Sequence, residues 1–432
     1  MVNKLKKLVL FPLCAAAVLG AAVGCGEDLT NKVVIWATAK EQSVIESVVE
    51  EYNKTAADED KIQIKFTAVA EGDTGAEIVK DPTAATSADL FLVADDHISN
   101  LVEKGIALEV TGTRKEAVIK DNTPVAVSGA TLNDKLYGFP ITSDNGYFLW
   151  YNKGVTGIDT AVSSLEDLLA LAKKNGKKVL MDVANGWYAN SFIMSPDACG
   201  VESLYWSTDA DGKSSYTTTW DNETGVKVSE YIGGLLKGYY DDGTLITGGN
   251  EQIIAGFTDS SLIAAVSGTW MEEDIKVTAG VGDNTAATIL PKYSIDGKSY
   301  QMASFIGSKV YCINKTKTTD KQKKAVKLAE LLTTKEAQLK RFEKRSTLPC
   351  NNEAIADARY TEHSTIGGAA LTAQATAAGV VQSKTAENRY WDIGKAIGQA
   401  YLDGKLGTQT DNTPNTWTTF LKGQMDTLRA KQ

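Results

Sequence analysis

The feature that most constrains this fold is an alternation of short apolar runs with amphipathic segments. Residues 33–36 (Val-Val-Ile-Trp) and 89–93 (Asp-Leu-Phe-Leu-Val) are compact apolar runs, typical of strands buried on both faces. Between them, apolar side chains recur at helical spacing from Val44 to Tyr52, and residues 62–66 alternate between apolar and polar. This strand–helix–strand order predicts an open, mostly parallel α/β sheet with right-handed crossovers.

Ligands of such sheets bind just beyond the carboxyl ends of the strands. The loops that follow the two apolar runs, 37–41 and 94–97, are therefore expected at the mouth of a site.

A second set of elements follows residue 140. About 400 residues exceed what one hydrophobic core usually supports, so two tightly joined domains are expected. The pattern predicts helices at 164–174, 224–238 and 325–332, strands at 178–181, 263–266 and 309–313, and a largely helical C-terminal third from about residue 364.

The first residues are typical of an export signal. Three lysines precede an apolar stretch at 8–23, which is short for a permanent anchor of about 20 residues and ends in small residues. Cys25 follows Ala-Val-Gly and resembles the cysteine of a bacterial lipobox, although Ala22 stands where leucine is usual. Residues 1–24 are thus expected to be a lipoprotein signal peptide, Cys25 a lipid anchor and residues 25–31 a tether. The alternative is a plain secretory signal with an incidental cysteine.

The composition excludes several kinds of partner. Removing residues 1–24 removes three lysines and no acid, so the net charge of −9 becomes −12, and no basic stripe suits nucleic acid. Cys199, Cys312 and Cys350 are an odd set without a CxxC spacing, so isolated thiols are expected, with one disulfide as the alternative. His97 and His363 leave little for metal chemistry, and no metal or cofactor is expected.

Several short segments follow one another in a characteristic order and spacing. They are 33–36 (VVIW), 88–91 (ADLF), 137–141 (YGFPI) with 150–153 (WYNK), 267–270 (SGTW), 304–307 (SFIG) and Tyr390-Trp391 with Ile393, Ala396 and Ile397. Each segment is weak alone. Together they resemble, over nearly the whole mature chain, the maltose/maltodextrin-type extracellular solute-binding proteins of bacterial ABC importers.

The resemblance implies a two-lobed, type II periplasmic-binding-protein-like α/β fold. One lobe would comprise 32–142 plus 308–348, and the other 147–304 plus 352–432. The chain would cross between them near 142–145, 304–307 and 347–350, where hinge residues absorb the rotation of closure.

The resemblance also implies a function. The chain would be a monomeric, lipid-anchored protein on the extracellular face of the membrane, with no catalytic residue. It would capture an oligosaccharide, of the maltodextrin type, and deliver it to the permease subunits of an ABC transporter.

A sugar offers an apolar C–H face and a rim of hydroxyls, so its site needs flat aromatic rings and planar hydrogen-bonding groups. On the resemblance, the ring platforms would be Trp187, Tyr188, Trp270 and Trp391. The polar contacts would be Lys40, Glu41, Asp95, Asp96 and Asp144.

Some of these assignments have structural alternatives. Asp95 and Asp96 could both be acids at a helix N-terminus, and of the two Asp96 is favoured as the ligand contact. Asp144 is shorter than the glutamate usual in the family, and Asn185 replaces a common acid. Val93 stands where the family often has tryptophan, so one platform is either missing or supplied by another ring. The alternatives for that ring are Trp206, Trp220 and Tyr147, whereas Trp36 and Trp150 are expected in the core.

Three rival functions stay open at this point. The same fold could bind another oligosaccharide, a sugar acid or a peptide, although arginine is scarce near the expected contacts, with Arg389 the one exception. A surface glycoside hydrolase would need two carboxylates flanking the bond, for which Asp96 and Asp144 are the only suggestion. A sensor that feeds a receptor would look the same in sequence.

Overall fold

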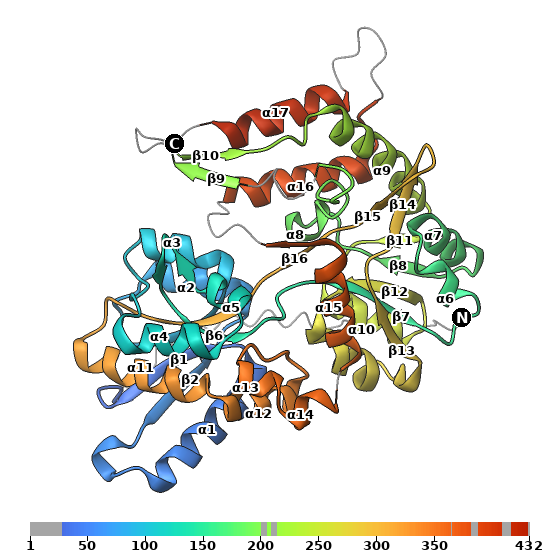
Figure 1. The fold of residues 1–432 in the computed structure, drawn as a ribbon. Coiled ribbons are helices and arrows are strands. Elements are labelled where there is room, and N and C mark those ends of the chain that lie inside the picture. Colours follow the sequence, from blue (N-terminus) through green and yellow to red (C-terminus); the bar gives the residue numbers. More distant parts are fainter. Residues whose placement is uncertain are drawn as a thin grey trace, which may run out of the picture.

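The computed structural model describes residues 28–199, 205–208, 214–363, 365–381, 388–407 and 416–430. The expected signal peptide, Cys25 and the start of the tether lie outside these ranges. The described elements form two lobes, each with a five-stranded sheet (Figure 1). Among the described helices, none combines the length and the apolar character needed to cross a membrane.

The first lobe is built on a sheet with strand order β2-β1-β3-β17-β6. Its strands are β1 (Lys32–Ala37), β2 (Gln63–Ala68), β3 (Leu90–Ala94), β6 (Phe139–Thr142) and β17 (Lys309–Ile313). The helices around it are α1 (Gln42–Thr55), α2 (Glu71–Lys80), α3 (Ile98–Glu103), α4 (Gly112–Asp121), α5 (Pro124–Gly129), α11 (Thr319–Leu332), α12 (Lys335–Arg345), α13 (Asn352–Ile355) and α14 (Ala358–Thr361). A short hairpin joins β4 (Thr131–Leu132) and β5 (Lys135–Leu136).

The second lobe is built on a sheet with strand order β11-β8-β12-β7-β13. Its strands are β7 (Phe148–Asn152), β8 (Lys178–Leu180), β11 (Leu245–Ile246), β12 (Leu262–Ser267) and β13 (Thr285–Thr288). Its helices are α6 (Ile158–Ala161), α7 (Leu165–Lys174), α8 (Gly186–Ala189), α9 (Glu223–Asp241), α10 (Asn250–Thr258), α15 (Ile366–Ala378), α16 (Asn388–Asp403) and α17 (Trp417–Arg429). Three two-stranded pairs complete it: β9 (Tyr205–Thr208) with β10 (Ser214–Thr217), β14 (Lys292–Ile295) with β15 (Lys298–Gln301), and β16 (Ser304–Ile306) with β18 (Gly379–Val381).

Each lobe has its own core, which follows from the sequence patterns. Residues 33–35 and 90–93 are buried within the first sheet, and the apolar stripe of α1 packs onto it. In α7 the side chain of Ser164 accepts a hydrogen bond from the Asp167 amide and caps the helix, whose leucines face the second core. The predicted α/β fold with two lobes is confirmed.

The sheets are mixed, whereas a mostly parallel arrangement was expected. In the first sheet β1 runs parallel to β2 and β3, but β17 is antiparallel to both β3 and β6. The second sheet repeats this plan, with β7 antiparallel to β12 and β13. The reason is that β17 enters the first sheet, and β7 the second, directly from the other lobe, without the crossover helix that a parallel strand needs.

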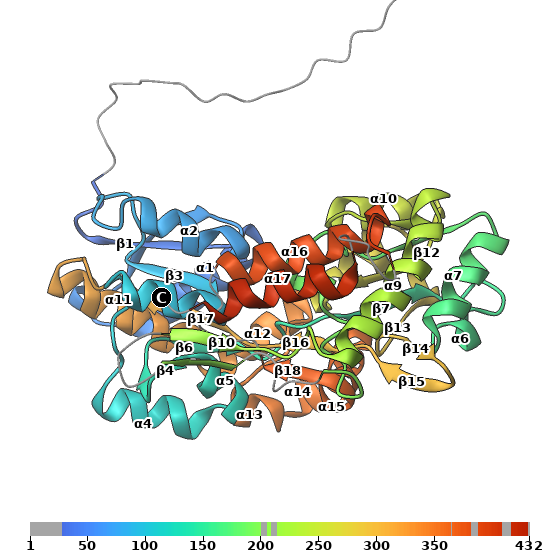
Figure 2. The same ribbon diagram turned by 90° about the horizontal axis from the view of Figure 1, so that it is seen from above.

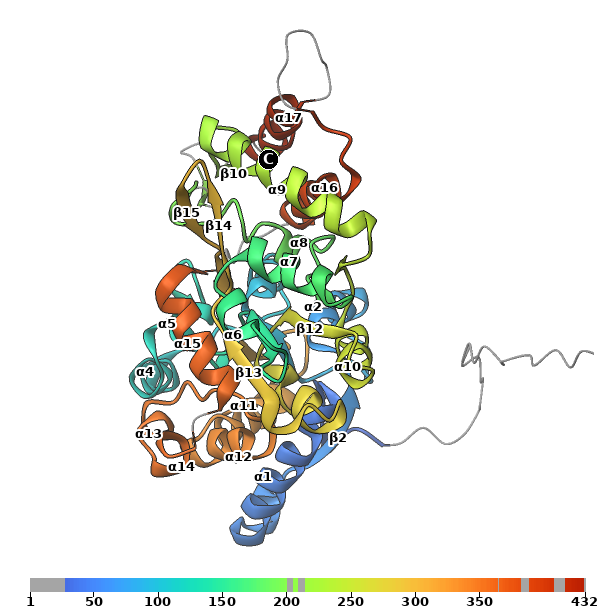
Figure 3. The same cartoon turned by 90° about the vertical axis from the view of Figure 1, so that its right-hand side faces the viewer.

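The chain therefore crosses between the lobes more than once. β6 belongs to the first sheet and β7 to the second, and β17 returns the chain to the first sheet after β16. Figure 2 shows the two lobes side by side, and Figure 3 shows α9, α16 and α17 at one end of the molecule and α1 at the other.

Candidate ligand-binding site

A cavity of about 600 Å³ lies between the two lobes and is lined by residues of both. The first lobe contributes side chains that follow β1 and β3, and the second contributes rings from α8, from the turn after β12 and from α16. The lining residues are Thr38, Lys40, Ala70, Gly72, Ala94, Asp96, His97, Asn145, Asn185, Trp187, Tyr188, Asn250, Trp270, Asp274, Lys309, Arg345 and Trp391.

The polar wall comes from the carboxyl ends of β1 and β3, where the sequence predicted it. Lys40 lies in a single 3₁₀ turn, η1 (Ala39–Glu41), after β1. Asp96 and His97 lie in a second such turn, η3 (Asp95–His97), after β3. The Oδ1 atom of Asp96 is buried and has no hydrogen-bond partner within the described residues. A buried carboxylate oxygen without a partner is costly, so this atom is well placed to accept a hydrogen bond from a ligand.

The aromatic wall begins with Trp187 and Tyr188 in the short helix α8. The side chain of Asn185 caps this helix by accepting a hydrogen bond from the Trp187 amide at 3.0 Å. Beneath them lies Tyr147, whose ring centre is 4.8 Å from those of both Trp187 and Tyr188. Tyr147 is fully buried, and its hydroxyl donates to the carbonyl of Trp187 at 3.0 Å. Burial also raises the pKa of the Tyr188 hydroxyl, so it stays protonated as a donor. This packing holds both rings in fixed orientations.

Trp270 faces the same cavity from the 3₁₀ turn η5 (Thr269–Met271), which follows β12. Its ring centre lies 5.9 Å from that of Trp187, and the two planes are inclined by 32°. A Cβ atom at Gly268 would lie 2.0 Å from the Trp270 ring. Only glycine therefore lets this indole fold back over the end of the strand.

Trp391 reaches the cavity from the first turn of α16. Its ring packs edge-on against Tyr390 at 4.7 Å and Phe305 at 5.9 Å. A Cβ atom at Gly186 would lie 2.3 Å from the carbonyl oxygen of Trp391, so glycine is needed for α8 and α16 to approach this closely. The structure thus brings all four predicted platforms to one cavity.

Asp144 is not at the cavity surface. It is fully buried, its Oδ1 lies 3.4 Å from the ammonium of Lys309, and its Oδ2 accepts from Thr269 at 3.3 Å. The ammonium of Lys309 also lies 5.5 Å from the centre of the Trp270 ring. Asp144 therefore positions cavity residues from behind instead of presenting its carboxylate to a ligand.

Glu41 is likewise absent from the cavity lining. Its buried carboxylate accepts from the Nε atom of Arg341 at 2.9 and 3.0 Å and from the Tyr311 hydroxyl at 3.3 Å, and it is paired with Arg345. Burial lowers the pKa of the Arg341 guanidinium, which is nevertheless held by this carboxylate. The predicted contact is a structural ion pair between η1 and α12.

Asp95 has a structural role as well. It is buried, and its Oδ2 accepts a hydrogen bond from the amide of Ser308 at 3.0 Å. Because Ser308 directly precedes β17, the Asp95 carboxylate fixes the point at which the chain re-enters the first lobe. Of the two acids, the favoured Asp96 is the one that lines the cavity.

The alternatives for an additional platform do not reach the cavity. Trp220 is fully buried and Tyr147 lies under the aromatic wall, while the side chain of Trp206 lies outside the described residues. Trp150 is in the core, as predicted, and its indole donates to the carbonyl of Gly268 at 3.0 Å. Trp36 is half-buried against the core of the first lobe. Arg389 donates to carbonyls at the end of α17 and is absent from the lining.

The sequence reasoning missed several lining residues, of which Lys309, Arg345 and Asp274 are charged. Asp274 lies in η6 (Asp274–Thr278) and forms a 3.0 Å ion pair with Lys40 across the two lobes. It follows the SGTW segment by only four residues, a spacing that could have identified it. No comparable local signal marks Lys309 or Arg345.

Within the described ranges, no group of three or more His, Cys, Asp or Glu side chains is arranged to hold a metal ion. Cys199, Cys312 and Cys350 are free thiols. The cavity therefore offers rings, amides and single charges as its binding groups.

Comparison with known proteins adds a family and a set of similar folds. Residues 47–368 match the family model described as bacterial extracellular solute-binding protein. No curated protein matches the chain. A structure solved with acarbose is 25% identical, with a TM-score of 0.76, and the match covers 92% of this chain and 98% of that one.

Two further structures share the fold at lower identity. The maltodextrin-binding protein MalE1 from L. casei BL23, without ligand, is 19% identical with a TM-score of 0.72, covering 92% of this chain and 99% of that chain. The Thermus thermophilus maltotriose-binding protein, bound with maltotriose, is 17% identical with a TM-score of 0.71 over the same shares.

Proposed function

Because the chain belongs to the bacterial extracellular solute-binding protein family, we propose that it captures an oligosaccharide, of the maltodextrin type, between its lobes and delivers it to an ABC transporter permease. The observation that carries this proposal is the convergence of rings from three separate elements on one cavity. Trp187 with Tyr188, Trp270 and Trp391 come from α8, η5 and α16, and all line the space that Lys40 and Asp96 close from the other lobe.

Flat rings at fixed angles suit the apolar faces of successive pyranose units. The inclination of 32° between Trp187 and Trp270 matches a chain that turns from one sugar to the next. Asp96 would accept hydroxyl hydrogen bonds, and Asn145, Asn185 and Asn250 would add planar amides. Such a site favours a neutral, hydroxyl-rich ligand over an anion.

The structure solved with acarbose supports the sugar assignment, because it is 25% identical to this chain and has a TM-score of 0.76. The maltotriose-bound structure of the Thermus protein supports the fold alone at its 17% identity.

Binding would proceed by closure of the two lobes on the ligand. A ligand that contacts both walls stabilises the closed form only to the extent that it makes more contacts there. We propose hinges near 142–145, 304–307 and 347–350. The lobes would be the expected 32–142 plus 308–348 and 147–304 plus 352–432, except that α13 and α14 pack against α12 and therefore belong with the first lobe. An affinity in the micromolar range, roughly −8 kcal/mol, is expected of a protein that must also release its ligand.

The site would bind without catalysis. A glycoside hydrolase needs two free carboxylates about 5 Å or about 6.5–9.5 Å apart on either side of the bond. Asp144 is buried behind the wall, and of the carboxylates that line the cavity, Asp274 is paired with Lys40. Among the lining residues, Asp96 therefore has no second free carboxylate with which to form a catalytic pair.

The protein would act at the extracellular face of the membrane, tethered as a monomer through lipid on Cys25. Tethering raises the local concentration of loaded protein near the permease, as linking does for any second binding event.

Calorimetric titration of the mature protein carrying Cys25→Ser tests the ligand. Maltotriose should bind with micromolar affinity, and cellotriose, xylotriose and raffinose should not. Heat from another of these sugars would replace the maltodextrin assignment while keeping the transport role. No heat from any of the four would contradict the sugar assignment and favour a peptide ligand or a sensor role.

A further inference from the structure

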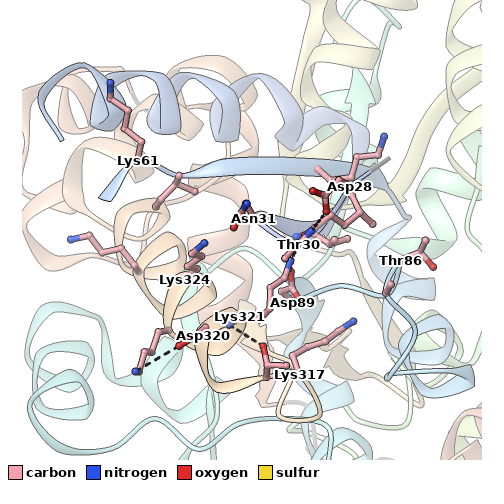
Figure 4. A pocket seen from close by; sticks show the side chains of 18 of the residues that line it. Asp28, Thr30, Asn31, Lys61, Thr86, Asp89, Lys317, Asp320, Lys321 and Lys324 are labelled. Atoms are coloured by element: carbon pink, nitrogen blue, oxygen red, sulfur yellow. Dashed lines mark hydrogen bonds and ion pairs between the residues drawn. The ribbon is translucent and has the colours of Figure 1, made fainter. Parts of the chain in front are cut away.

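A second, larger cavity of about 1240 Å³ lies on the first lobe and takes no part in the proposed sugar site. Most of its lining precedes β1, β2 and β3 or lies on the first nine residues of α11, and Val34, Lys65 and Thr67 add side chains from within β1 and β2. It therefore lies toward the amino ends of β1 and β3 and extends along β2, whereas the sugar cavity lies beyond the carboxyl ends of β1 and β3. Figure 4 shows Lys61, Lys317, Lys321 and Lys324 around this hollow.

The cavity is basic in a chain whose net charge is −9. Seven lysines line it against five acidic residues. Two of those acids are already satisfied by the protein. Asp89 accepts from the Val34 amide at 2.8 Å and pairs with Lys321 at 3.3 Å, and Asp28 accepts from the Thr30 amide at 2.9 Å. Seven positive charges against five negative ones leave an excess of two, although Lys61 is also paired at 2.6 Å with Asp58, which lies outside the lining.

The lysines of α11 supply this excess. Lys324 is exposed and forms no ion pair or hydrogen bond through its side chain within the described residues. Lys327 lies over the ring of Tyr52 at 5.3 Å, and the ammonium of Lys323 is 3.9 Å from Asp320, too far for a hydrogen bond. Lys324 therefore has no partner among the described residues, and Lys323 and Lys327 have only weak, exposed ones, so all three ammonium groups remain accessible to an anion.

Two further lysines are fixed in the wall of the cavity. Lys321 donates to the carbonyl of Leu29 at 2.6 Å, and Lys317 donates to the carbonyl of Ala84 at 2.6 Å. Burial lowers the pKa of Lys317, the charge of Asp89 offsets part of this lowering, and the nearby charge of Lys321 adds to it. A bound anion would relieve this repulsion. The N-cap of α11, Thr318, also lines the cavity, so the positive end of a 14-residue helix adds to the field.

Lysine side chains act as point charges that suit phosphate oxygens. The position of the cavity indicates where such phosphates would come from. Leu29, Thr30 and Asn31 form part of its lining, and Asp28 is three residues from Cys25. Three residues of extended chain span at most about 10 Å. A lipid anchor at Cys25 would thus hold the cavity mouth within about one Debye length of the headgroups.

We propose that this lysine-lined cavity binds the phosphate groups of anionic membrane lipids and holds the base of the first lobe against the bilayer. The sugar cavity, at the opposite ends of the same strands, would then face away from the membrane until the protein moves to its permease. The orientation rests on the proposed anchor at Cys25, whereas the binding of anionic lipid does not.

Co-sedimentation with vesicles tests the proposal, using the mature protein with Cys25→Ser so that no acyl chain contributes. Wild type should sediment with vesicles of equal parts phosphatidylglycerol and phosphatidylcholine and stay in solution with pure phosphatidylcholine. Lys323→Gln with Lys324→Gln should weaken the partition roughly five-fold for each lysine, roughly 25-fold together. Both side chains are exposed on α11, so the fold should persist. Lys104→Gln with Lys120→Gln, exposed on the same lobe outside the cavity, is the charge-matched control and should retain the wild-type partition.

Three results would overturn the proposal. Wild type could sediment equally with both vesicles, which would show that anionic lipid is not needed. The two double variants could lose the partition equally, which would show that only the net charge of the protein matters. Glycerol phosphate could displace the protein at a concentration equal to that of the lipid phosphate, at matched ionic strength, which would assign the cavity to a soluble phosphate ester. Maltotriose titration of the same variants separates this question from the sugar site, since failure of either measurement leaves the other unaffected.

Discussion

The ammonium of Lys309 lies 3.4 Å from the carboxylate of Asp144, with 5% and 0% of the two side chains exposed. Asp144 lies between β6 and β7, where the chain leaves the first lobe, and Lys309 is the first residue of β17, where the chain returns. One buried ion pair thus joins two crossings of the chain, directly behind the Trp270 ring.

Breaking this pair from one side should strongly destabilise the protein. Lys309→Met leaves the buried Asp144 carboxylate without its cation, and Asp144→Asn leaves the ammonium, so each should lower the free energy of unfolding by about 3–5 kcal/mol. The double variant should lose less than the sum, because no buried charge remains. Urea unfolding measures this. The exposed pair Lys422–Asp426, neutralised in the same way, is the control and should change stability little. Additive losses at 144 and 309 would show that the two charges do not interact.

Trp270→Ala and Trp391→Ala should each weaken binding of the preferred sugar by about 1–3 kcal/mol, because each removes a ring anchored at the cavity. Calorimetry measures the affinity, and circular dichroism checks that the fold is kept. Tyr240→Ala, on the exposed face of α9, should bind as wild type does. Wild-type affinity in either tryptophan variant would remove that residue from the site.

The ion pair between Lys40 and Asp274 should favour the closed form only modestly. It joins the lobes at 3.0 Å, but 48% of the lysine side chain and 23% of the aspartate side chain are exposed. A double-mutant cycle with Lys40→Ala and Asp274→Ala should give a coupling in sugar affinity of at most about 1 kcal/mol. The coupling should fall at high salt because dissolved ions screen an exposed pair. A coupling that salt does not change would indicate contacts other than charge.

The three thiols should resist alkylation in the folded protein. Burial raises the pKa of Cys312 and Cys350 to about 12, and desolvation raises that of Cys199 to about 12 as well. Only the thiolate reacts, so at pH 8 labelling by iodoacetamide should be slower than for a free cysteine by on the order of 10³-fold. Mass spectrometry should find no modified Cys199, Cys312 or Cys350 in the native protein and all three modified in guanidinium. Fast native labelling of one thiol would show that its segment opens.

The sequence was sufficient for the elements with strong periodicity. Apolar runs predicted β1, β3 and β12 within a residue or two, because a strand buried on both faces has little choice of composition. The sequence pattern also predicted that the loops after β1 and β3 lie at the cavity. The antiparallel strands could not be predicted in the same way, since a strand's own residues do not record from which lobe the chain enters a sheet.

The aromatic residues that line the cavity could be predicted from the sequence, whereas the acidic ones could be predicted less well. A tryptophan in a polar or glycine-rich loop is rarely needed by a core, so Trp187 and Trp270 stood out. An acid after a strand carries no such information, because it serves either a ligand or a cation of the protein. Glu41 is paired with Arg341, which lies 300 residues away in sequence, and only the folded chain shows that contact.

The place of β17 has a consequence for how the protein is made. In the first sheet this strand sits between β3 and β6, yet it begins at residue 309, more than 160 residues after β6 ends at residue 142. A growing chain that has emerged as far as residue 300 therefore has β3 and β6 but nothing to join them. The first lobe cannot complete its sheet until nearly three-quarters of the polypeptide has been synthesised. Such a delay leaves the first lobe without its native sheet during most of synthesis, and a lobe that has not folded is easier to thread through a translocation channel.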